Sequence, residues 1–266
     1  MRLLLTLNHR PHLRLSFHYP YHISSWIYHI LSQADSTFAQ WLHEKGFPYG
    51  LRSYKLFTFS PLQPSAFRID RKANQFIATQ PPTTLVLSFW LDKALEHFVM
   101  GLFQAQHLHI GDSTYQAHME VSSIEMLRTP QFQTTMRYRT RSPICLTRHE
   151  PENKYAQFLS PDHPLFGQYL IHNLLRKQRA IAGVPAGMGK DHWPEQPDNL
   201  KFRLLTPASR LRSRLLRIKN VNLRGFLFDF ELTAPVALHQ LGYFAGFGEK
   251  NSAIGMGLVD VMKGKS

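Results

Sequence analysis

The chain has 266 residues, which is enough for one large domain or two medium ones. Hydrophobic residues make up 43% of the sequence and charged residues only 18%, and this balance excludes a disordered protein. The 31 lysines and arginines outnumber the 18 acidic residues by 13, so the composition favours a polyanionic partner, either nucleic acid or an anionic membrane surface.

Periodicity and capping signals predict the elements of the first half. Residues 2–8 form a strand-like run, and apolar spacing predicts a helix that begins at Ser24 or Ser25. Asp35 is placed to cap a second helix, and Gly46 is placed to end it. The remaining predicted elements are strands at 54–62, 66–69, 74–79 and 84–90, a helix at 91–104 and a strand at 115–127.

The same order of elements recurs in the second half. Its predicted elements are a strand at 134–147, a helix at 164–181, strands at 211–219 and 226–234, a helix at 236–246 and a strand at 253–262. Two β-α-β-β-α-β halves predict an α+β fold of tandem ferredoxin-like (RRM-like) domains, at residues 1–127 and 128–266. The alternating Phe226, Phe228 and Phe230 are able to stack bases, but core packing is the better prediction for them.

The cellular setting follows from two simple features. The single cysteine, Cys145, cannot form an internal disulfide, which is typical of a reducing cytosol. The first apolar run is too short for a signal peptide, and the longest one, at 84–103, is interrupted by charged residues. We therefore expect a cytoplasmic protein without a membrane partner.

Basic residues are concentrated in the second half. Residues 201–224 carry eight basic residues and no acidic one. Two rows alternate, so on strands each row shares one face: Arg210, Arg212 and Arg214, and Arg137, Arg139 and Arg141. A single such row is usually a solvated strand face. Two rows in one half favour phosphate contacts and stacking of arginine on unpaired bases of RNA.

A pair of histidines at 107–109 raises the question of a metal site. In "HLH" both imidazoles lie on one face of a strand, as metal ligands do. No cysteine or third histidine lies at ligand spacing, so we expect no metal and no cofactor.

The motif "GFGEKNSAIGMG", at 246–257, contains two G-x-G pairs. Glycine lets backbone N–H groups approach a phosphate closely, although a tight turn followed by a bulged strand explains glycines equally well. The whole motif resembles the glycine-rich loop of the RAMP superfamily. Together with "SSWIYHIL", "WLHEKGF", "YKLFTFSPL", "RSPICL" and "HNLLRK", it is similar to the CRISPR-associated endoribonucleases that cut precursor crRNA.

This resemblance implies a protein that binds a CRISPR repeat RNA and cleaves it without metal. The products would carry a 2′,3′-cyclic phosphate and a 5′-hydroxyl. The glycine-rich loop would shape the RNA-binding surface between the domains, through Gly246, Gly248, Lys250, Asn251, Gly255 and Gly257. Further expected partners are other CRISPR-associated proteins and a second copy of the chain.

The resemblance also assigns the catalytic residues. His43 matches the catalytic histidine of the family, Tyr28 its tyrosine and Lys55 its lysine. RNA cleavage by the 2′-hydroxyl needs a base, an acid and positive charge on the phosphorane. The acid and base roles of His43 are both open, and His22 and His29 are alternative acids.

Two other functions compete with this one. The first is a non-catalytic RNA-binding subunit of the RAMP superfamily in a CRISPR effector complex, which would keep the basic rows and the glycine loop. The second is a general basic RNA-binding protein, recognised by salt-dependent binding to any RNA.

Overall fold

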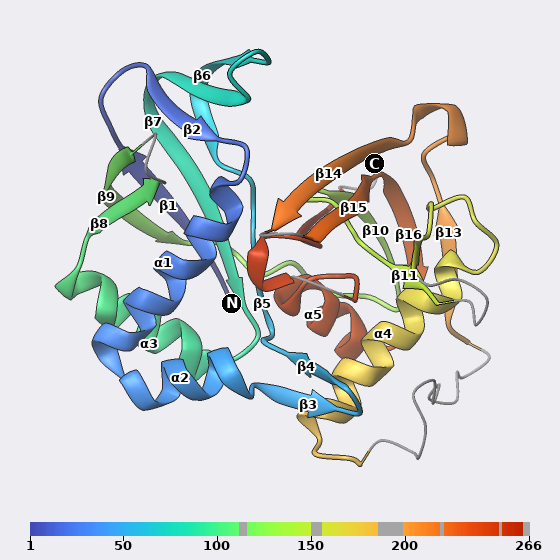
Figure 1. Ribbon diagram of the computed structural model, residues 1–266. Helices are drawn as coiled ribbons and strands as arrows, with labels where there is room; N and C mark the ends of the chain where they lie inside the picture. Colours follow the sequence, from blue (N-terminus) through green and yellow to red (C-terminus); the bar gives the residue numbers. More distant parts are fainter. Residues whose placement is uncertain (112–115, 150–155, 186–198, 219–220, 250–251, 263–266) are drawn as a thin grey trace.

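The computed structural model describes residues 1–111, 116–149, 156–185, 199–218, 221–249 and 252–262. Two β-sheets, each with its own helices, lie next to each other (Figure 1). Among the described residues, no helix is long and apolar enough to cross a membrane.

The first sheet has the strand order β2-β7-β1-β9-β8, with β5 and β6 also paired to β7. Its strands are β1 (Arg2–Asn8), β2 (Leu13–Ser16), β5 (Phe57–Phe59), β6 (Gln63–Asp70), β7 (Gln75–Phe89), β8 (His107–Gly111) and β9 (Gln116–Met126). Helices α1 (Tyr19–Ala34) and α3 (Asp92–Gln104) pack against each other, and α2 (Ser36–Glu44) follows α1. The short hairpin of β3 (Phe47–Tyr49) and β4 (Arg52–Tyr54) comes before β5.

The second sheet has the order β13-β16-β10-β17. Its strands are β10 (Thr135–Thr140), β13 (Lys201–Leu204), β16 (Asp229–Thr233) and β17 (Val259–Val261), and its helices are α4 (Phe166–Ile181) and α5 (Val236–Ala245). Between β13 and β16 the chain inserts the 3₁₀ turn η1 (Ala208–Arg210) and the hairpin of β14 (Arg212–Ile218) and β15 (Val221–Leu227). The small pair β11 (Thr147–Arg148) and β12 (Gln157–Phe158) and the 3₁₀ turn η2 (Ser252–Ile254) complete the described elements.

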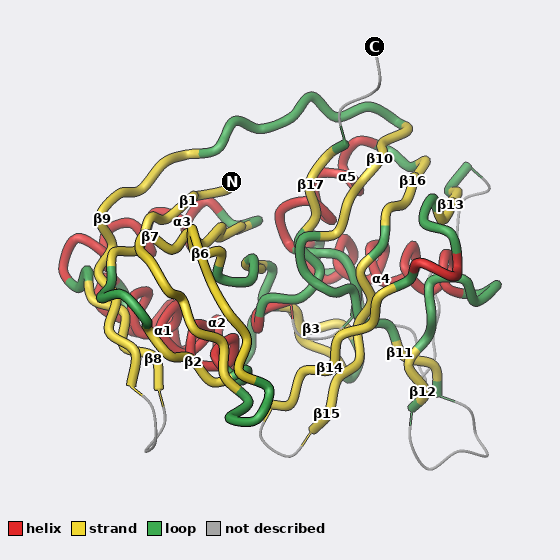
Figure 2. Tube along the Cα trace, turned by 90° about the horizontal axis from the view of Figure 1, so that it is seen from above, coloured by secondary structure: helices red, strands yellow, loops and turns green. Residues whose placement is uncertain are grey.

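Both sheets follow one topology. In each β-α-β-β-α-β unit, the first and third strands lie in the middle: β1 and β7 in the first sheet, β10 and β16 in the second. All of these pairings are antiparallel, which is the ferredoxin-like arrangement. The predicted tandem ferredoxin-like fold is therefore confirmed. The chain crosses from β9 to β10 in a long extended loop (Figure 2), and the division at residue 127 stays a prediction.

Each sheet carries its own hydrophobic core. In the first, alternate residues of β1 (Leu3, Leu5 and Leu7) are 0–2% exposed and face the helices. In the second, Phe228 and Phe230 are 3% and 0% exposed, which confirms that they pack in the core, and Phe226 of β15 is half-buried and packs against it.

Some predicted boundaries were wrong. Helix α1 begins at Tyr19, with proline in its first turn, and Ser24 is buried inside the helix, so neither Ser24 nor Ser25 is the N-cap. The predicted strands at 74–79 and 84–90 are one strand, β7, whose two edges together pair with four other strands. The predicted strand at 54–62 is interrupted at Leu56, whose φ is +55°. The predicted strand at 253–262 shrinks to β17, because the preceding glycines form the loop described below.

Candidate active site

The ring of Tyr28 contacts the imidazole of His43 edge to face. The two ring centroids are 4.8 Å apart, and the ring planes meet at 88°. Tyr28 projects from α1 and is half-buried, with the Phe57 ring of β5 also packed against it. Burial raises the pKa of the Tyr28 hydroxyl, so this group stays protonated at neutral pH and is able to donate a hydrogen bond.

Two local signals place His43 in the last turn of α2, where its side chain is exposed. The helix begins where the carboxylate of Asp35 accepts a hydrogen bond of 2.8 Å from the backbone N–H of Phe38, as predicted. It ends at Gly46, whose φ is +57°, also as predicted. A Cβ on Gly46 would lie 2.6 Å from the carbonyl oxygen of Tyr54, so glycine lets β4 approach the end of α2.

Lys55 reaches the same end of α2 from the segment between β4 and β5. Its Cδ lies 3.0 Å from the position of a Cβ on Gly46. Its Nζ is 3.3 Å from Oγ of Ser53, and this hydroxyl donates to the carbonyl of Lys45. Partial burial lowers the pKa of Lys55, and none of the described carboxylates forms an ion pair with it. A cation is thus available at the end of α2, whose last turn carries His43.

The three predicted catalytic residues therefore gather at one place, although they come from three segments of the chain. Their catalytic roles stay a prediction. The alternative acids lie along α1: His29 is exposed, and His22 is half-buried with its ring centroid 5.9 Å from that of Tyr21.

The glycine-rich loop packs against α1, which carries Tyr28, and against β5, which follows Lys55 in the chain. Its turn η2 contacts both α1 and β5. All four glycines have positive φ values between 80° and 94°, a region that other residues rarely adopt. A Cβ on Gly255 would lie 2.5 Å from the Phe59 ring, and one on Gly257 would lie 1.9 Å from the carbonyl oxygen of Phe247. The glycines thus allow the loop to pack closely against the protein itself.

The glycines predicted to contact RNA, Gly246, Gly248, Gly255 and Gly257, are all buried. Their backbone contacts neighbouring parts of the protein, and the RNA contacts of these glycines stay a prediction. Lys250 and Asn251, the other predicted contacts in the loop, lie outside the described residues.

Lys177 of α4, which the sequence analysis missed, holds this loop in place. Its side chain is 2% exposed, and its ammonium donates to the carbonyl oxygens of Gly246, at 2.5 Å, and Gly248, at 3.0 Å. Burial lowers the pKa of Lys177 to about 7. The helical spacing of Leu170, Leu174 and Lys177 was the available signal, since it puts a lysine on the apolar face of a helix.

Arg137 and Arg139 of β10 share one face of the strand, as predicted, and Arg141 follows directly after the strand. Acidic side chains of neighbouring strands pair with all three. The three pairs are Arg137 with Glu231 at 2.8 Å, Arg139 with Asp229 at 2.7 Å and Arg141 with Asp260 at 3.2 Å. Each acidic partner offsets the positive charge of its arginine. The sequence does not reveal this pairing, because the partners lie on other strands. The RNA-binding role of these arginines stays a prediction.

The second basic row is divided between two elements. Arg210 belongs to η1, so the prediction that it shares a strand face with the other two was wrong. Arg212 and Arg214 do lie two residues apart on β14 and are exposed. Neither forms an ion pair with a described residue. Arg212 and Arg214 are therefore better suited to bind a phosphate than the first row, because no described carboxylate offsets their charge.

The histidines of β8 have a neighbour that the sequence spacing concealed. His107 and His109 are exposed on one face, as predicted, and His118 of β9 lies opposite His109. Nδ1 of His109 and Nδ1 of His118 are 2.5 Å apart. Within the described ranges, no three His, Cys, Asp or Glu side chains are grouped to hold a metal ion.

The fold is thus a tandem of two ferredoxin-like domains, with a glycine-rich loop packed against α1 and β5. The family model described as "CRISPR associated protein Cas6, C-terminal" matches residues 127–261, which is half of the chain. The model "CRISPR-associated protein Cas6, N-terminal" matches residues 14–121. The chain belongs to the Cas6 family.

Individual relatives agree with this assignment. The chain is similar to the CRISPR-associated endoribonuclease Cas6 1 of Methanocaldococcus jannaschii, at 28% identity over 262 residues, which are 97% of this chain and 92% of the relative. A solved structure of CRISPR associated protein Cas6 is 26% identical and has a TM-score of 0.74, with 99% of both chains covered. A solved structure of a Cas6-related gene product from Pyrococcus furiosus has a TM-score of 0.78 at 21% identity. It covers 99% of this chain and 98% of that chain, and it supports the fold alone.

Proposed function

We propose that this protein is a metal-independent endoribonuclease that cleaves CRISPR repeat RNA in precursor crRNA. The observation that carries the proposal is the contact between the rings of Tyr28 and His43 at the end of α2, which the side chain of Lys55 also reaches. Membership of the Cas6 family and the similarity to an endoribonuclease over 97% of the chain support it. The one cysteine is free and buried, in keeping with the cytoplasm as the place of this reaction.

The reaction needs two proton transfers and positive charge at the phosphorane. The three side chains supply one proton-transfer group, a cation and a hydrogen-bond donor, and solvent water exchanges the second proton. The 2′-hydroxyl loses its proton to a base, and its oxygen attacks the neighbouring phosphorus. The bond from phosphorus to the 5′-oxygen breaks, and that oxygen takes a proton from an acid. His43 carries out one of these two proton transfers. Lys55 stabilises the negative charge on the phosphorane, and the protonated Tyr28 hydroxyl donates a hydrogen bond that orients the phosphate. The products are a 2′,3′-cyclic phosphate and a 5′-hydroxyl.

Cleavage of end-labelled repeat RNA in EDTA tests the proposal. The wild type should cut the RNA, a 2′-deoxy sugar at the cut site should block cutting, and His43→Ala should reduce the rate by about 100- to 10,000-fold without weakening binding. Phosphatase should remove the terminal phosphate of the upstream product only after acid opens the cyclic ester.

The alternative functions are outcomes of the same experiment. Tight binding of repeat RNA without cutting by the wild type would leave a non-catalytic RNA-binding subunit. Binding of unrelated RNA as tightly as repeat RNA, with a strong dependence on salt, would indicate a general RNA-binding protein. If His43→Ala still cuts the RNA, the protein is an endoribonuclease in which another residue carries out the proton transfer. His22 and His29 would be tested next.

A further inference from the structure

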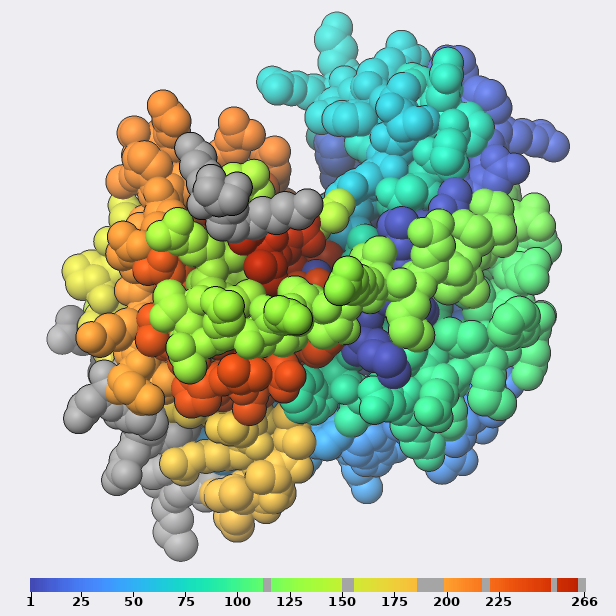
Figure 3. Space-filling model, turned by 180° about the vertical axis from the view of Figure 1, so that it is seen from behind, coloured from blue at the N-terminus to red at the C-terminus, as the bar shows by residue number. Residues whose placement is uncertain are grey.

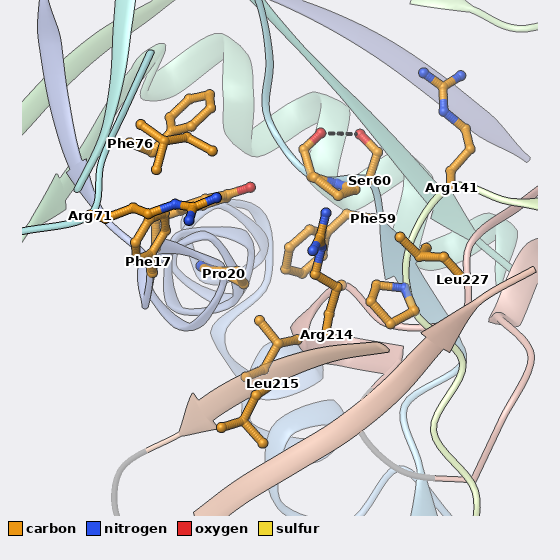
Figure 4. Close-up of a pocket in the computed structure, with 16 residues that line it drawn as sticks. Phe17, Pro20, Phe59, Ser60, Arg71, Phe76, Arg141, Arg214, Leu215 and Leu227 are labelled. Carbon is orange, nitrogen blue, oxygen red and sulfur yellow. Dashed lines mark hydrogen bonds between the residues drawn. The ribbon is translucent and has the colours of Figure 1, made fainter. Parts of the chain in front are cut away.

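A pocket lies between the two domains, on the side of the β14–β15 hairpin. It has a volume of about 530 Å³, within the range of pockets that bind small organic molecules. The first domain contributes residues that precede or begin α1 and residues around the β6–β7 turn, and the second contributes the hairpin (Figure 4). Figure 3 shows from behind the hollow between the two parts of the molecule at this end. We call this space the cleft pocket.

Large apolar side chains line the cleft pocket although solvent reaches them. Phe17, just before α1, is 37% exposed, and Leu215 of β14 is 59% exposed. The Phe76 ring of β7 lines the same space and is stacked on the Phe67 ring at a centroid distance of 5.1 Å. Apolar surface kept in contact with water on both sides of one pocket indicates a binding site for a ligand with a flat or apolar part.

Arginines give the pocket its charge. Arg71 enters from the β6–β7 turn, and the side chain of Arg214 rises from β14 into the pocket (Figure 4). Both are exposed, and neither forms an ion pair with a described residue, whereas Arg141 at the pocket is bound to Asp260 and Gln63. Two uncompensated guanidinium groups beside aromatic and aliphatic walls match a nucleotide, with its anionic phosphate and its flat base.

The floor of the cleft pocket connects it to the candidate active site. Phe59 of β5 and Gly255 of the glycine-rich loop both line it. Phe59 is four residues after Lys55, so their Cα atoms are at most about 14 Å apart. Phe57, between them, packs against Tyr28. One RNA strand is thus able to pass from the catalytic residues into the pocket within a few nucleotides.

We propose that the cleft pocket holds one unpaired base of the repeat RNA, close in sequence to the cut site, between Phe17 and Leu215, with Arg71 and Arg214 on the flanking phosphates. This inference rests on the proposed function and goes further, because it makes the pocket a determinant of where the RNA is cut. The base must be unpaired, because a paired base presents only its edge to a protein and not its face.

The test couples a protein change to an RNA change. Binding is measured on repeat RNA with a 2′-deoxy sugar at the cut site, which separates affinity from cutting. A series of such RNAs carries one abasic nucleotide at each position in turn. The variants are Phe17→Ala and Leu215→Ala, and Phe103→Ala is the matched control, since Phe103 is 74% exposed on α3 and does not line the pocket.

Phe17→Ala should weaken binding of the intact RNA about tenfold, and Phe103→Ala should leave it unchanged. At one position near the cut site, the abasic nucleotide should weaken binding to the wild type by a similar factor and have little further effect on Phe17→Ala. In cleavage assays, Phe17→Ala should raise KM and leave kcat nearly unchanged, because it does not touch the reacting atoms.

Additive effects at every position would overturn the pocket assignment, as would unchanged binding by Phe17→Ala and Leu215→Ala. The proposed function would survive both results as long as the wild type still cuts the RNA in EDTA. Failure of the wild type to bind repeat RNA would instead overturn both proposals. The two failures are therefore distinguishable.

Discussion

The guanidinium of Arg2 lies over the ring of Tyr243, with its central carbon 3.3 Å from the ring centroid. Arg2 belongs to β1 of the first domain and Tyr243 to α5 of the second. The same guanidinium donates to the carbonyl oxygens of Tyr243, at 2.6 Å, and Val259, at 2.7 Å. Because the side chain is 2% exposed, this contact joins the two domains through a cation that water does not reach.

Arg2→Ala should therefore lower the free energy of unfolding by about 3 kcal/mol, because charged hydrogen bonds to two carbonyls and the contact with the ring are lost together. Urea unfolding measures the change. Arg10→Ala is the matched control, since Arg10 is exposed and close in sequence, and it should change stability by less than about 0.5 kcal/mol. Equal effects of the two variants would show that Arg2 does not stabilise the domain interface.

Gly255→Ala should destabilise the protein far more than Gly183→Ala does. Both glycines have a positive φ, +80° and +67°, so each alanine costs about 1 kcal/mol of backbone strain. Only at Gly255 does the new Cβ also meet the Phe59 ring, at 2.5 Å, whereas nothing lies within 4 Å at Gly183. We expect a total loss of about 3 kcal/mol for Gly255→Ala. Equal melting temperatures of the two variants would contradict the packing role of Gly255.

Lys177 should make stability rise with pH above neutrality. Burial lowers its pKa from 10.5 to about 7 in the folded protein, whereas the unfolded chain keeps the ordinary value. Between these two values the unfolded state binds a proton that the folded state does not. The free energy of unfolding therefore rises with pH, by up to about 1.4 kcal/mol per unit.

Urea unfolding of the wild type and Lys177→Met between pH 7 and pH 9 measures this contribution. Other groups affect both proteins equally, so the difference between their slopes isolates Lys177. Parallel pH profiles would contradict a lowered pKa of Lys177.

The two basic rows should differ in how they affect the salt dependence of RNA binding. Arg212→Ala removes a cation that forms no ion pair with a described residue, and it should reduce the slope of log affinity against log salt by about 0.7. The double variant Arg139→Ala/Asp229→Ala removes a pair that is already neutral, so its slope should match that of the wild type. A drop in the double variant as large as that of Arg212→Ala would show that Arg139 leaves Asp229 to bind a phosphate.

Sequence patterns predicted the helices and much of the first helical region, because these depend on neighbouring residues. They missed β13, and the strand predicted at 211–219 is β14 of the inserted hairpin, outside the second sheet. Asp35 caps α2 through a group three residues away, and Gly46 ends it by its own backbone conformation. The start of α1 was missed because a proline in its first turn, not a capping serine, marks where it begins. The burial of Phe228 and Phe230 followed from simple alternation.

The sequence by itself thus determined the tandem fold, the excess of basic over acidic residues and the residue types available for acid–base chemistry. Only the tertiary structure decided which of these groups meet. It paired Arg139 with Asp229, 90 residues away, placed Lys177 under the glycine-rich loop and brought Tyr28 to His43. Periodicity and capping act over a few residues, whereas these contacts are set when sheets and helices from distant segments bury their apolar faces together.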